Sequence, residues 1–312
     1  MQAGATSRRN DIEDVLIENA LGQGMFVGDK VFPPIASGEQ DARFDKLAFA
    51  QIKTTSVDDL AASTSESNQV EHEYTTDNFK TVERRLKELV TYRDNALLKG
   101  FDAEVNVSAG LQYYMRLKQE KRVADIAFDV TTSFVSYTTA VTIPWSTSAT
   151  ATPVKDIQTA YQSLLDQING RSDGARLVGI GNWQARIDLL ASADVKNRWL
   201  YANGKGDMKD LTNQQIADVL GLDEVHFSRL QIDSAQIWNS DRFGIYMVSD
   251  NPMIKSAVRV GNTFYWTGNS PAMWNVESWE NVDPDGTMIR VQTDSIEKLI
   301  TARAGHVLTA VD

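Results

Sequence analysis

The 312-residue chain contains no cysteine and only three histidines. Without cysteine there are no disulfide bonds, thiolate metal ligands or cysteine nucleophiles, which is typical of a protein that folds in a reducing compartment. His72, His226 and His306 lie far apart in the sequence and complete no HxxxH or HExxH pattern, so we interpret them as surface or packing residues. The chain therefore has little material for a metal site or for histidine-based catalysis.

Motifs that bind phosphate or support hydrolysis are also missing. The glycines at positions 22, 24 and 28 and those at 179 and 181 complete neither a GxGxxG nor a GxxxxGK[ST] pattern, and no GxSxG occurs. No spacing among the 42 acidic residues selects a carboxylate pair. We predict no catalytic residues, no metal and no cofactor. A hydrolase with a carboxylate pair is the alternative from another class, and it would be a compact monomer with a deep cleft.

Charge and hydropathy exclude two classes of partner. With 31 basic and 42 acidic residues the formal net charge is −11, which disfavours non-specific binding of nucleic acid over the whole surface. No apolar run approaches the roughly 18–20 residues that cross a bilayer, and the first residues contain no apolar segment of the secretory type. We expect a soluble chain that binds no membrane and is assembled inside a cell.

The first ninety residues do not have the pattern of a compact domain. Pro33 and Pro34 favour an extended arm over residues 26–35, because proline fixes φ and pushes the preceding residue into an extended conformation. Extended segments at 43–52 and 70–82 flank a polar stretch at 54–68, which predicts a β-hairpin with a long polar tip. A lone two-stranded hairpin is marginally stable in water, so the arm and the hairpin should pack on neighbouring copies of the chain. The residues expected to make these intersubunit contacts are Phe26, Phe32, Phe44, Leu47, Phe49, Arg84 and Arg85.

A long helix is expected after the hairpin. Apolar residues recur at spacings of three, four and seven, which predicts a helix over Asp102–Asp129. At 1.5 Å per residue this helix would be roughly 40 Å long. Arg116 and Glu120, like Lys121 and Asp125, are four residues apart, which predicts two ion pairs on its exposed surface.

The second half of the chain alternates helices and short strands, so the predicted fold class is α+β. Thr152 before Pro153 predicts the start of one helix, and the capping box of Thr212 and Gln215 predicts another, which Gly221 ends. Further strands are expected at 130–143, 176–180, 225–230, 243–248, 262–267, 287–293 and 296–303, with a helix from Asn182, a turn at Asp283–Gly286 and a tail at 307–311.

Six segments, in this order and spacing, carry a resemblance over nearly the whole chain: Lys30–Ile35, Gln119–Asp125, Thr152–Ile157, Leu177–Trp183, Leu211–Val225 and Glu297–Leu308. Together they resemble the major capsid protein of tailed bacteriophages, the family with the HK97-type fold. The resemblance implies an N-terminal arm (1–40), an E-loop hairpin (41–90), a peripheral domain with a spine helix (91–152, helix about 102–129), an axial domain (153–284) and return strands of the peripheral domain (285–312).

The resemblance also implies a structural function without catalytic residues. The protein would assemble into hexamers and pentamers of an icosahedral shell that encloses double-stranded DNA without binding it specifically. Its partners would be other copies of itself, scaffolding and portal proteins, and decoration proteins; its location would be the virion capsid, assembled in the host cytoplasm. An encapsulin, a cellular shell of the same fold around a cargo enzyme, is the alternative, and the long extended arm favours the phage capsid.

Overall fold

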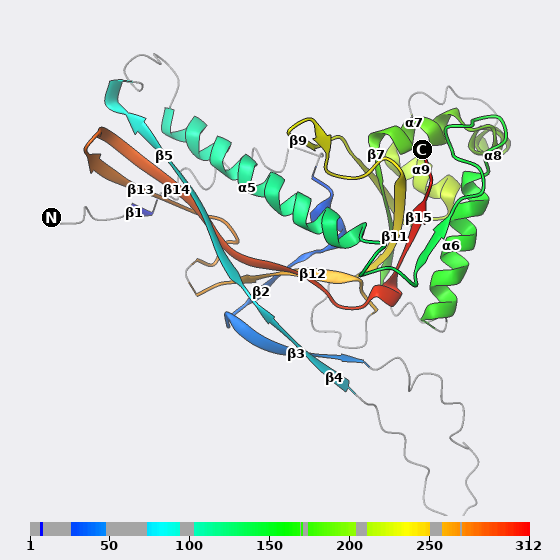
Figure 1. Cartoon of the computed structure of the whole chain (residues 1–312), viewed down its shortest axis with the longest axis horizontal. Helices are drawn as coiled ribbons and strands as arrows, with labels where there is room; N and C mark the ends of the chain where they lie inside the picture. Colours follow the sequence, from blue (N-terminus) through cyan, green and yellow to red (C-terminus); the bar gives the residue numbers. More distant parts are fainter. Residues whose placement is uncertain are drawn as a thin grey trace, which may run out of the picture.

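Two β-sheets with their covering helices organise the protein (Figure 1). The computed structural model describes residues 7–8, 26–47, 74–93, 103–168, 170, 174–203, 211–249, 258–268 and 270–312. One sheet lies beneath a single long helix, and the other is surrounded by the shorter helices of the second half of the chain. A separate hairpin projects from the first sheet.

The first sheet has six strands and is built around one long strand, β14. Its strands are β1 (Ser7–Arg8), β2 (Pro34–Ser37), β5 (Val82–Thr91), β12 (Gly261–Trp266), β13 (Asn275–Val282) and β14 (Asp285–Leu299). Strands β13 and β5 pair with opposite edges of β14, and β12 pairs with its C-terminal part. Because β2 pairs with β12 and β1 with β13, segments from the beginning of the chain complete a sheet made mainly from its end.

The second sheet has five strands in the order β6-β15-β11-β7-β8. The strands are β6 (Thr138–Ala140), β7 (Arg176–Asn182), β8 (Glu224–Ser228), β11 (Arg242–Val248) and β15 (Gly305–Thr309). The helices of this region are α6 (Pro153–Gln167), α7 (Trp183–Ala191), α8 (Ala193–Asn203) and α9 (Asn213–Leu220), with a 3-10 helix at Ala302–Ala304. A small ribbon pairs β9 (Gln231–Ile232) with β10 (Ala235–Gln236).

Helix α5 (Ala103–Ala127) confirms the long helix that the apolar spacing predicted, and it connects two cores. Leu111 and Met115, in its N-terminal half, are buried in a small core against β14 and β13. Val123 and Ala124, near its C-terminal end, are buried in the large core that also contains the second sheet and its helices. The helix thus packs against both cores and helps to hold the two sheets together.

Local capping signals in the second half of the chain are largely confirmed. Thr212 and Gln215 form both bonds of a capping box, and Gly221 ends α9 in the left-handed conformation at φ 74°. Asn182 accepts a hydrogen bond from the backbone of α7, as an N-cap does. The predicted start of a helix at Thr152–Pro153 is confirmed, because α6 begins at Pro153 with Thr152 at the N-cap position, although the Thr152 hydroxyl makes no capping bond. The first turn of α6 is instead satisfied in part by a distant carboxylate, that of Asp194, which accepts from the N–H of Val154 at 3.3 Å.

Replacing Thr212 with alanine tests the capping box. The change removes the hydroxyl that accepts from the backbone of Gln215, so we expect the free energy of unfolding to fall by about 1 kcal/mol, a typical value for loss of an N-cap. Urea denaturation of the two proteins measures the difference. Thr159→Ala, at an exposed hydroxyl inside α6 that bonds only the preceding turn, is the matched control and should change stability less.

Three predictions about strands and one about helices need correction. The two predicted closing strands form one strand, β14. Asp294 and Ser295, which lie between the two predicted strands, both pair with β5, and the ladder with β12 begins at Ser295. Strand β13 was not expected, and the segment 130–143 contributes only the short β6. Helix α8 was not expected either.

Strand pairing also differs from the predicted domain boundaries. Strands β12 and β13 were grouped with the axial segment 153–284, but both belong to the sheet beneath α5. Strand β15 was grouped with the return strands of that sheet, but it pairs with β11 and β6 in the second sheet. The chain therefore crosses between the two sheets more often than the sequence indicated, and the positions of the domain boundaries stay a prediction.

Candidate intersubunit surfaces

The hairpin of β3 (Asp41–Leu47) and β4 (Tyr74–Lys80) projects from the rest of the protein (Figure 1). Its strands pair antiparallel, from Asp41 opposite Lys80 at the base to Leu47 opposite Tyr74 at the outer end. This pairing agrees with the hairpin expected over residues 41–90. The hairpin ends where β5 begins, however, so the last part of that range is a sheet strand and not an extension of the hairpin.

Aromatic packing fixes the base of the hairpin to its own subunit. The rings of Phe79 and Phe264 are stacked with centroids 4.1 Å apart, and Phe44 lies 5.6 Å from Phe264. Lys298 of β14 forms an ion pair with Asp77 of β4 at 3.2 Å. The direction of the hairpin is therefore set by contacts within its own chain. The outer ends of β3 and β4 extend beyond these contacts.

Phe32 is a core residue, so the prediction that it contacts a neighbouring subunit is wrong. Its side chain is fully buried, and a Cβ on Gly261 would lie 2.6 Å from its ring. Phe26 is half-buried against α5, with its ring 5.8 Å from that of Tyr113 and 4.8 Å from the guanidinium carbon of Arg116. The order of apolar residues in the arm indicated burial correctly but not whether the partner was the same chain.

The other expected contact residues lie in separate places. Leu47 is the last residue of β3, and Phe49 lies outside the described residues. Arg84 and Arg85 are neighbours on β5, where Arg84 is half-buried and the exposed Arg85 pairs with Glu83 at 3.3 Å. The structure thus brings Phe44 to the hairpin base and the two arginines to the edge of the first sheet, and it does not gather the expected residues into one surface.

The expectation that the first ninety residues have no core of their own is wrong for two parts of them. Strand β2 and the short helix α2 (Gly28–Val31) are integrated into the protein, with Val31 fully buried. Strand β5 is a full member of the first sheet, and its Val90 is 5% exposed. Of the described residues in this region, the outer part of the β3–β4 hairpin is the segment that projects.

A buried carboxylate joins the arm to α5 and to the second half of the chain. Glu120 is 3% exposed, and its carboxylate accepts from the N–H groups of Val27 and Gly28, both at 2.9 Å. The indole N–H of Trp238 donates to the same carboxylate at 2.7 Å. A Cβ on Gly28 would lie 2.7 Å from a Glu120 oxygen, so a larger residue here would displace the carboxylate. We call this group of four residues the Glu120 junction.

The Glu120 junction changes the ion pairs expected on α5. Glu120 points into the protein and not toward Arg116, which pairs instead with Asp29 at 3.3 Å. Lys121 and Asp125 do form the expected exposed pair. Burial raises the pKa of the Glu120 carboxyl to about 7, and this effect exceeds the lowering by its three hydrogen bonds.

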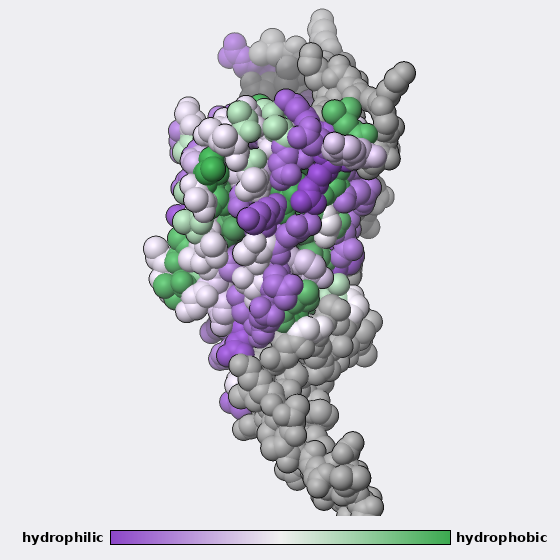
Figure 2. All heavy atoms as spheres, turned by 90° about the vertical axis from the view of Figure 1, so that its right-hand side faces the viewer, coloured by the Kyte–Doolittle hydropathy of each residue, from purple (hydrophilic) through white to green (hydrophobic). Residues whose placement is uncertain are grey.

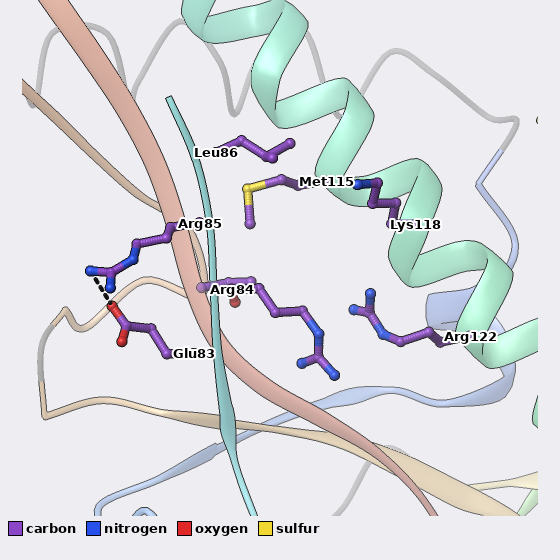
Figure 3. A pocket seen from close by; sticks show the side chains of 8 residues that line it. Glu83, Arg84, Arg85, Leu86, Met115, Lys118 and Arg122 are labelled. Atoms are coloured by element: carbon purple, nitrogen blue, oxygen red, sulfur yellow. Dashed lines mark ion pairs between the residues drawn. The ribbon is translucent and has the colours of Figure 1, made fainter. Parts of the chain in front are cut away.

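A pocket of about 440 Å³ lies between β5 and α5 (Figure 3). We call it the β5–α5 pocket; the residues that line it are Glu83, Arg84, Arg85, Leu86, Met115, Lys118, Arg122 and Thr293. Arg84 and Arg122 point toward each other across its opening, and the Glu83–Arg85 pair lies on the other side of β5. Burial and the nearby charge of Arg122 lower the pKa of the Arg84 guanidinium.

Histidines and acidic residues do not form a metal site in the part of the chain that the structure describes. His226 contacts Glu224 at 2.9 Å, and His306 contacts the hydroxyl of Thr139 at 3.0 Å. Burial lowers the pKa of both imidazoles. These two residues have the packing role that the sequence indicated, and His72 lies outside the described residues.

Two further surface properties bear on assembly. No helix among the described residues is long and apolar enough to span a membrane. On the face at the right-hand end of Figure 1, which Figure 2 shows directly, hydrophobic residues occur in small groups separated by hydrophilic ones. The described part of this face therefore presents no broad apolar patch.

Sequence reasoning missed the Glu120 junction and most of the β5–α5 pocket. Glu120 lies in a strongly charged stretch of the sequence, which is the usual pattern of a solvated helix face. The partners of Arg122 and Arg84 are distant: Glu297 binds Arg122 through two hydrogen bonds of 2.8 Å, and the carbonyl of Ser295 accepts from Arg84. No local spacing indicates contacts between residues so far apart in the chain.

Comparison with known proteins identifies the fold. No family model and no curated protein matches the sequence. A phage-related protein from Bordetella bronchiseptica RB50 is 17% identical, with 99% of both chains covered and a TM-score of 0.70. The capsid structure of the cyanophage P-SCSP1u is 10% identical over 99% of this chain and 90% of that chain, with a TM-score of 0.55. The SrpI encapsulin complex from Synechococcus elongatus PCC 7942 is 9% identical over 91% of this chain and 86% of that chain, with a TM-score of 0.51.

These likenesses extend over nearly the entire chain, so they concern the whole arrangement of both sheets and α5 and not one common motif. The chain has the HK97-type α+β fold of phage capsid proteins, which confirms the fold class expected from the order of its segments.

Proposed function

We propose that this protein is the structural subunit of an icosahedral phage capsid. The observation that carries the proposal is the likeness over 99% of the chain to the cyanophage capsid protein. The subunit would form the hexamers and pentamers of a closed shell around double-stranded DNA and have no enzymatic activity. It would be located in the virion after assembly in the host cytoplasm, with scaffolding, portal and decoration proteins as further partners.

The projecting hairpin supports self-association on physical grounds. Two strands that extend beyond their own core gain little from hydrophobic burial, while ordering them costs conformational entropy. Contact with a neighbouring copy offsets this cost. We propose that β3–β4 is the E-loop of the fold and that Phe26, Phe44, Leu47, Phe49, Arg84 and Arg85 are candidates for intersubunit contacts.

Negative-stain electron microscopy of the purified protein, combined with sedimentation, tests the function. We expect closed shells of uniform size from the protein alone or with its scaffolding protein. A monomer under both conditions would overturn the proposal. Shells that contain a packaged protein in place of DNA would instead favour the encapsulin alternative, for which the likeness to the SrpI encapsulin complex is the specific observation.

Shortening the hairpin separates assembly from folding. Leu47 and Tyr74 are paired directly opposite each other, so replacing residues 48–73 with an Asn-Gly turn joins the two strands without changing their register. We expect a folded subunit that forms no closed shells, because the contacts at Phe79 and Phe264 that hold the hairpin base are kept. Circular dichroism measures folding, and electron microscopy measures assembly.

A matched control for this variant is Gly-Ser insertion after Gly170, an exposed residue in the turn that follows α6, away from the hairpin, which should assemble normally. Wild-type yields of shells from the shortened protein would contradict the proposed role of the hairpin. Such yields would not bear on the capsid function itself, which the microscopy of the unmodified protein tests.

A further inference from the structure

The β5–α5 pocket has two cations, Arg84 and Lys118, that form no ion pair within the described part of the chain; the Glu297 carboxylate attracts Arg84, but less strongly than the charge of Arg122 repels it. The carboxylate of Glu297, which is 2% exposed, binds Arg122 through both oxygens. Arg84 donates only to uncharged backbone carbonyls, those of Val82 and Ser295. Lys118 is exposed at the rim and has no ion-pair partner within the described part of the chain. Arg84 and Lys118 therefore make the pocket a site for an anion.

The floor of the pocket is apolar. Met115, 5% exposed, and Leu86 lie side by side between β5 and α5 (Figure 3). An occupant that matches both features carries an apolar side chain next to carboxylates. A nucleic acid backbone fits poorly, because its binding requires an extended row of cations and this protein has a net charge of −11.

The chain itself presents a segment with this chemistry at the turn between β13 and β14. The residues of this β13–β14 turn, Val282–Asp285, are all exposed, and Val282 is 82% exposed, an unusual fraction for a valine. Asp283 and Asp285 flank Pro284 and form no ion pair within the described part of the chain. The side-chain amide of Asn281 donates to the carbonyl of Pro284 at 2.9 Å, which holds the turn in shape.

The turn cannot reach the pocket of its own subunit. In the ladder of β5 with β14, Gly286 beside the turn pairs with Thr91, whereas Thr293 in the pocket pairs with Arg84. These positions are seven residues apart on one strand, which is about 23 Å at the rise of a β-strand. Any contact between turn and pocket is therefore made between two copies of the chain, and it joins two different surfaces, the arrangement that closes rings.

We propose that the β13–β14 turn of one subunit binds in the β5–α5 pocket of a neighbouring subunit. Val282 packs on the floor of Leu86 and Met115, and the carboxylates of Asp283 and Asp285 lie between Arg84 and Lys118. This inference rests on the proposed function, since it specifies one contact of the shell.

A charge swap tests the contact. Lys118→Glu and Asp285→Lys each place like charges at the contact, which opposes binding, so we expect each to lower the yield of shells about tenfold or more. The double variant restores the attraction, and we expect it to recover most of the yield. Both side chains are exposed, so circular dichroism of the variants should match the wild type. Sedimentation at a fixed protein concentration measures the yield.

Matched controls use exposed residues outside the contact. Lys155→Glu on α6 makes the same charge change as Lys118→Glu, and Val135→Ser tests an exposed valine as the counterpart of Val282→Ser. We expect both controls to assemble like the wild type and Val282→Ser to assemble less.

Two outcomes would overturn the inference: single charge variants that assemble at wild-type yield, or a double variant that assembles no better than the singles. Failure of the unmodified protein to form shells, in contrast, would count against the proposed function. The two failures are thus distinguishable in one set of measurements. If Lys118→Glu did not fold, Lys118→Ala with Val282→Ser would test the same contact by loss of attraction.

Discussion

Deleting residues 2–30 is expected to leave no folded subunit, whereas deleting residues 2–24 is expected to leave one. The longer deletion removes Val27, which is 2% exposed, and the N–H groups of Val27 and Gly28 that bind the buried carboxylate of Glu120. Burial of one valine contributes about 1.5–3 kcal/mol, and each of the two hydrogen bonds to the Glu120 carboxyl about 0.5–3 kcal/mol, the higher figure applying to its charged form. The total is comparable with the whole stability of a typical domain.

The shorter deletion keeps these contacts. Among the described residues it removes only Ser7 and Arg8 of β1, a two-residue strand on the outer side of β13. Circular dichroism and thermal unfolding distinguish the two proteins. A cooperative unfolding transition in the protein that lacks residues 2–30 would show that α2 and the Glu120 junction are dispensable. This expected outcome differs from the expectation from the sequence that the arm packs on neighbouring copies of the chain.

Replacing Glu120 with alanine is expected to lower the free energy of unfolding by roughly 3–9 kcal/mol. The change leaves three buried N–H donors, those of Val27, Gly28 and Trp238, without their acceptor. Each unsatisfied buried donor costs about 1–3 kcal/mol. Urea denaturation measures the loss, and Glu88→Ala, at an exposed position of β5, is the matched control. Equal stability of the two variants would contradict the assigned role of the junction.

The same carboxylate gives the subunit a pH-dependent stability. The pKa of Glu120 is about 7 in the folded protein, against 4.5 for an ordinary glutamate, because burial disfavours the charged form. Between these values the unfolded chain has released the proton that the folded protein still holds. This stabilisation is therefore complete below pH 4.5 and is lost as the pH rises through 7.

The difference amounts to roughly 3 kcal/mol, at about 1.4 kcal/mol for each unit of pH between the two pKa values. Glu120→Gln, which has no proton to release, should unfold with a weaker pH dependence than the wild type over this range. Denaturation of both proteins at pH 4, 5.5 and 7.5 measures the effect. Parallel stability profiles would show that the carboxyl does not titrate in this interval.

Features encoded over a few residues could be predicted from the sequence. The capping box at Thr212, the left-handed Gly221 and the apolar spacing of α5 depend on neighbours within one or two turns of helix. The order of such segments was sufficient to identify the fold. The aromatic residues of the arm also indicated burial. The packing site of Phe32, however, is beside Gly261, more than two hundred residues away in the sequence.

Features that depend on distant pairing could not be predicted. Asp294 and Ser295 lie between the two predicted closing strands, yet both pair with β5 and β14 continues through them. Arg84 in isolation is an exposed cation on a charged strand. Arg84 lies opposite Arg122 only because α5 packs over β5, and this packing also forms the pocket that both residues line.

The continuity of β14 has a mechanical consequence. Strand β14 extends from the exposed turn beside Val282 to the 3-10 helix that precedes β15, and it is hydrogen-bonded on both edges over most of its length. A tensile load along this axis is shared by many backbone hydrogen bonds in shear, whereas peeling at a free edge breaks them one after another. The subunit should therefore resist stretching along β14 far better than bending across it.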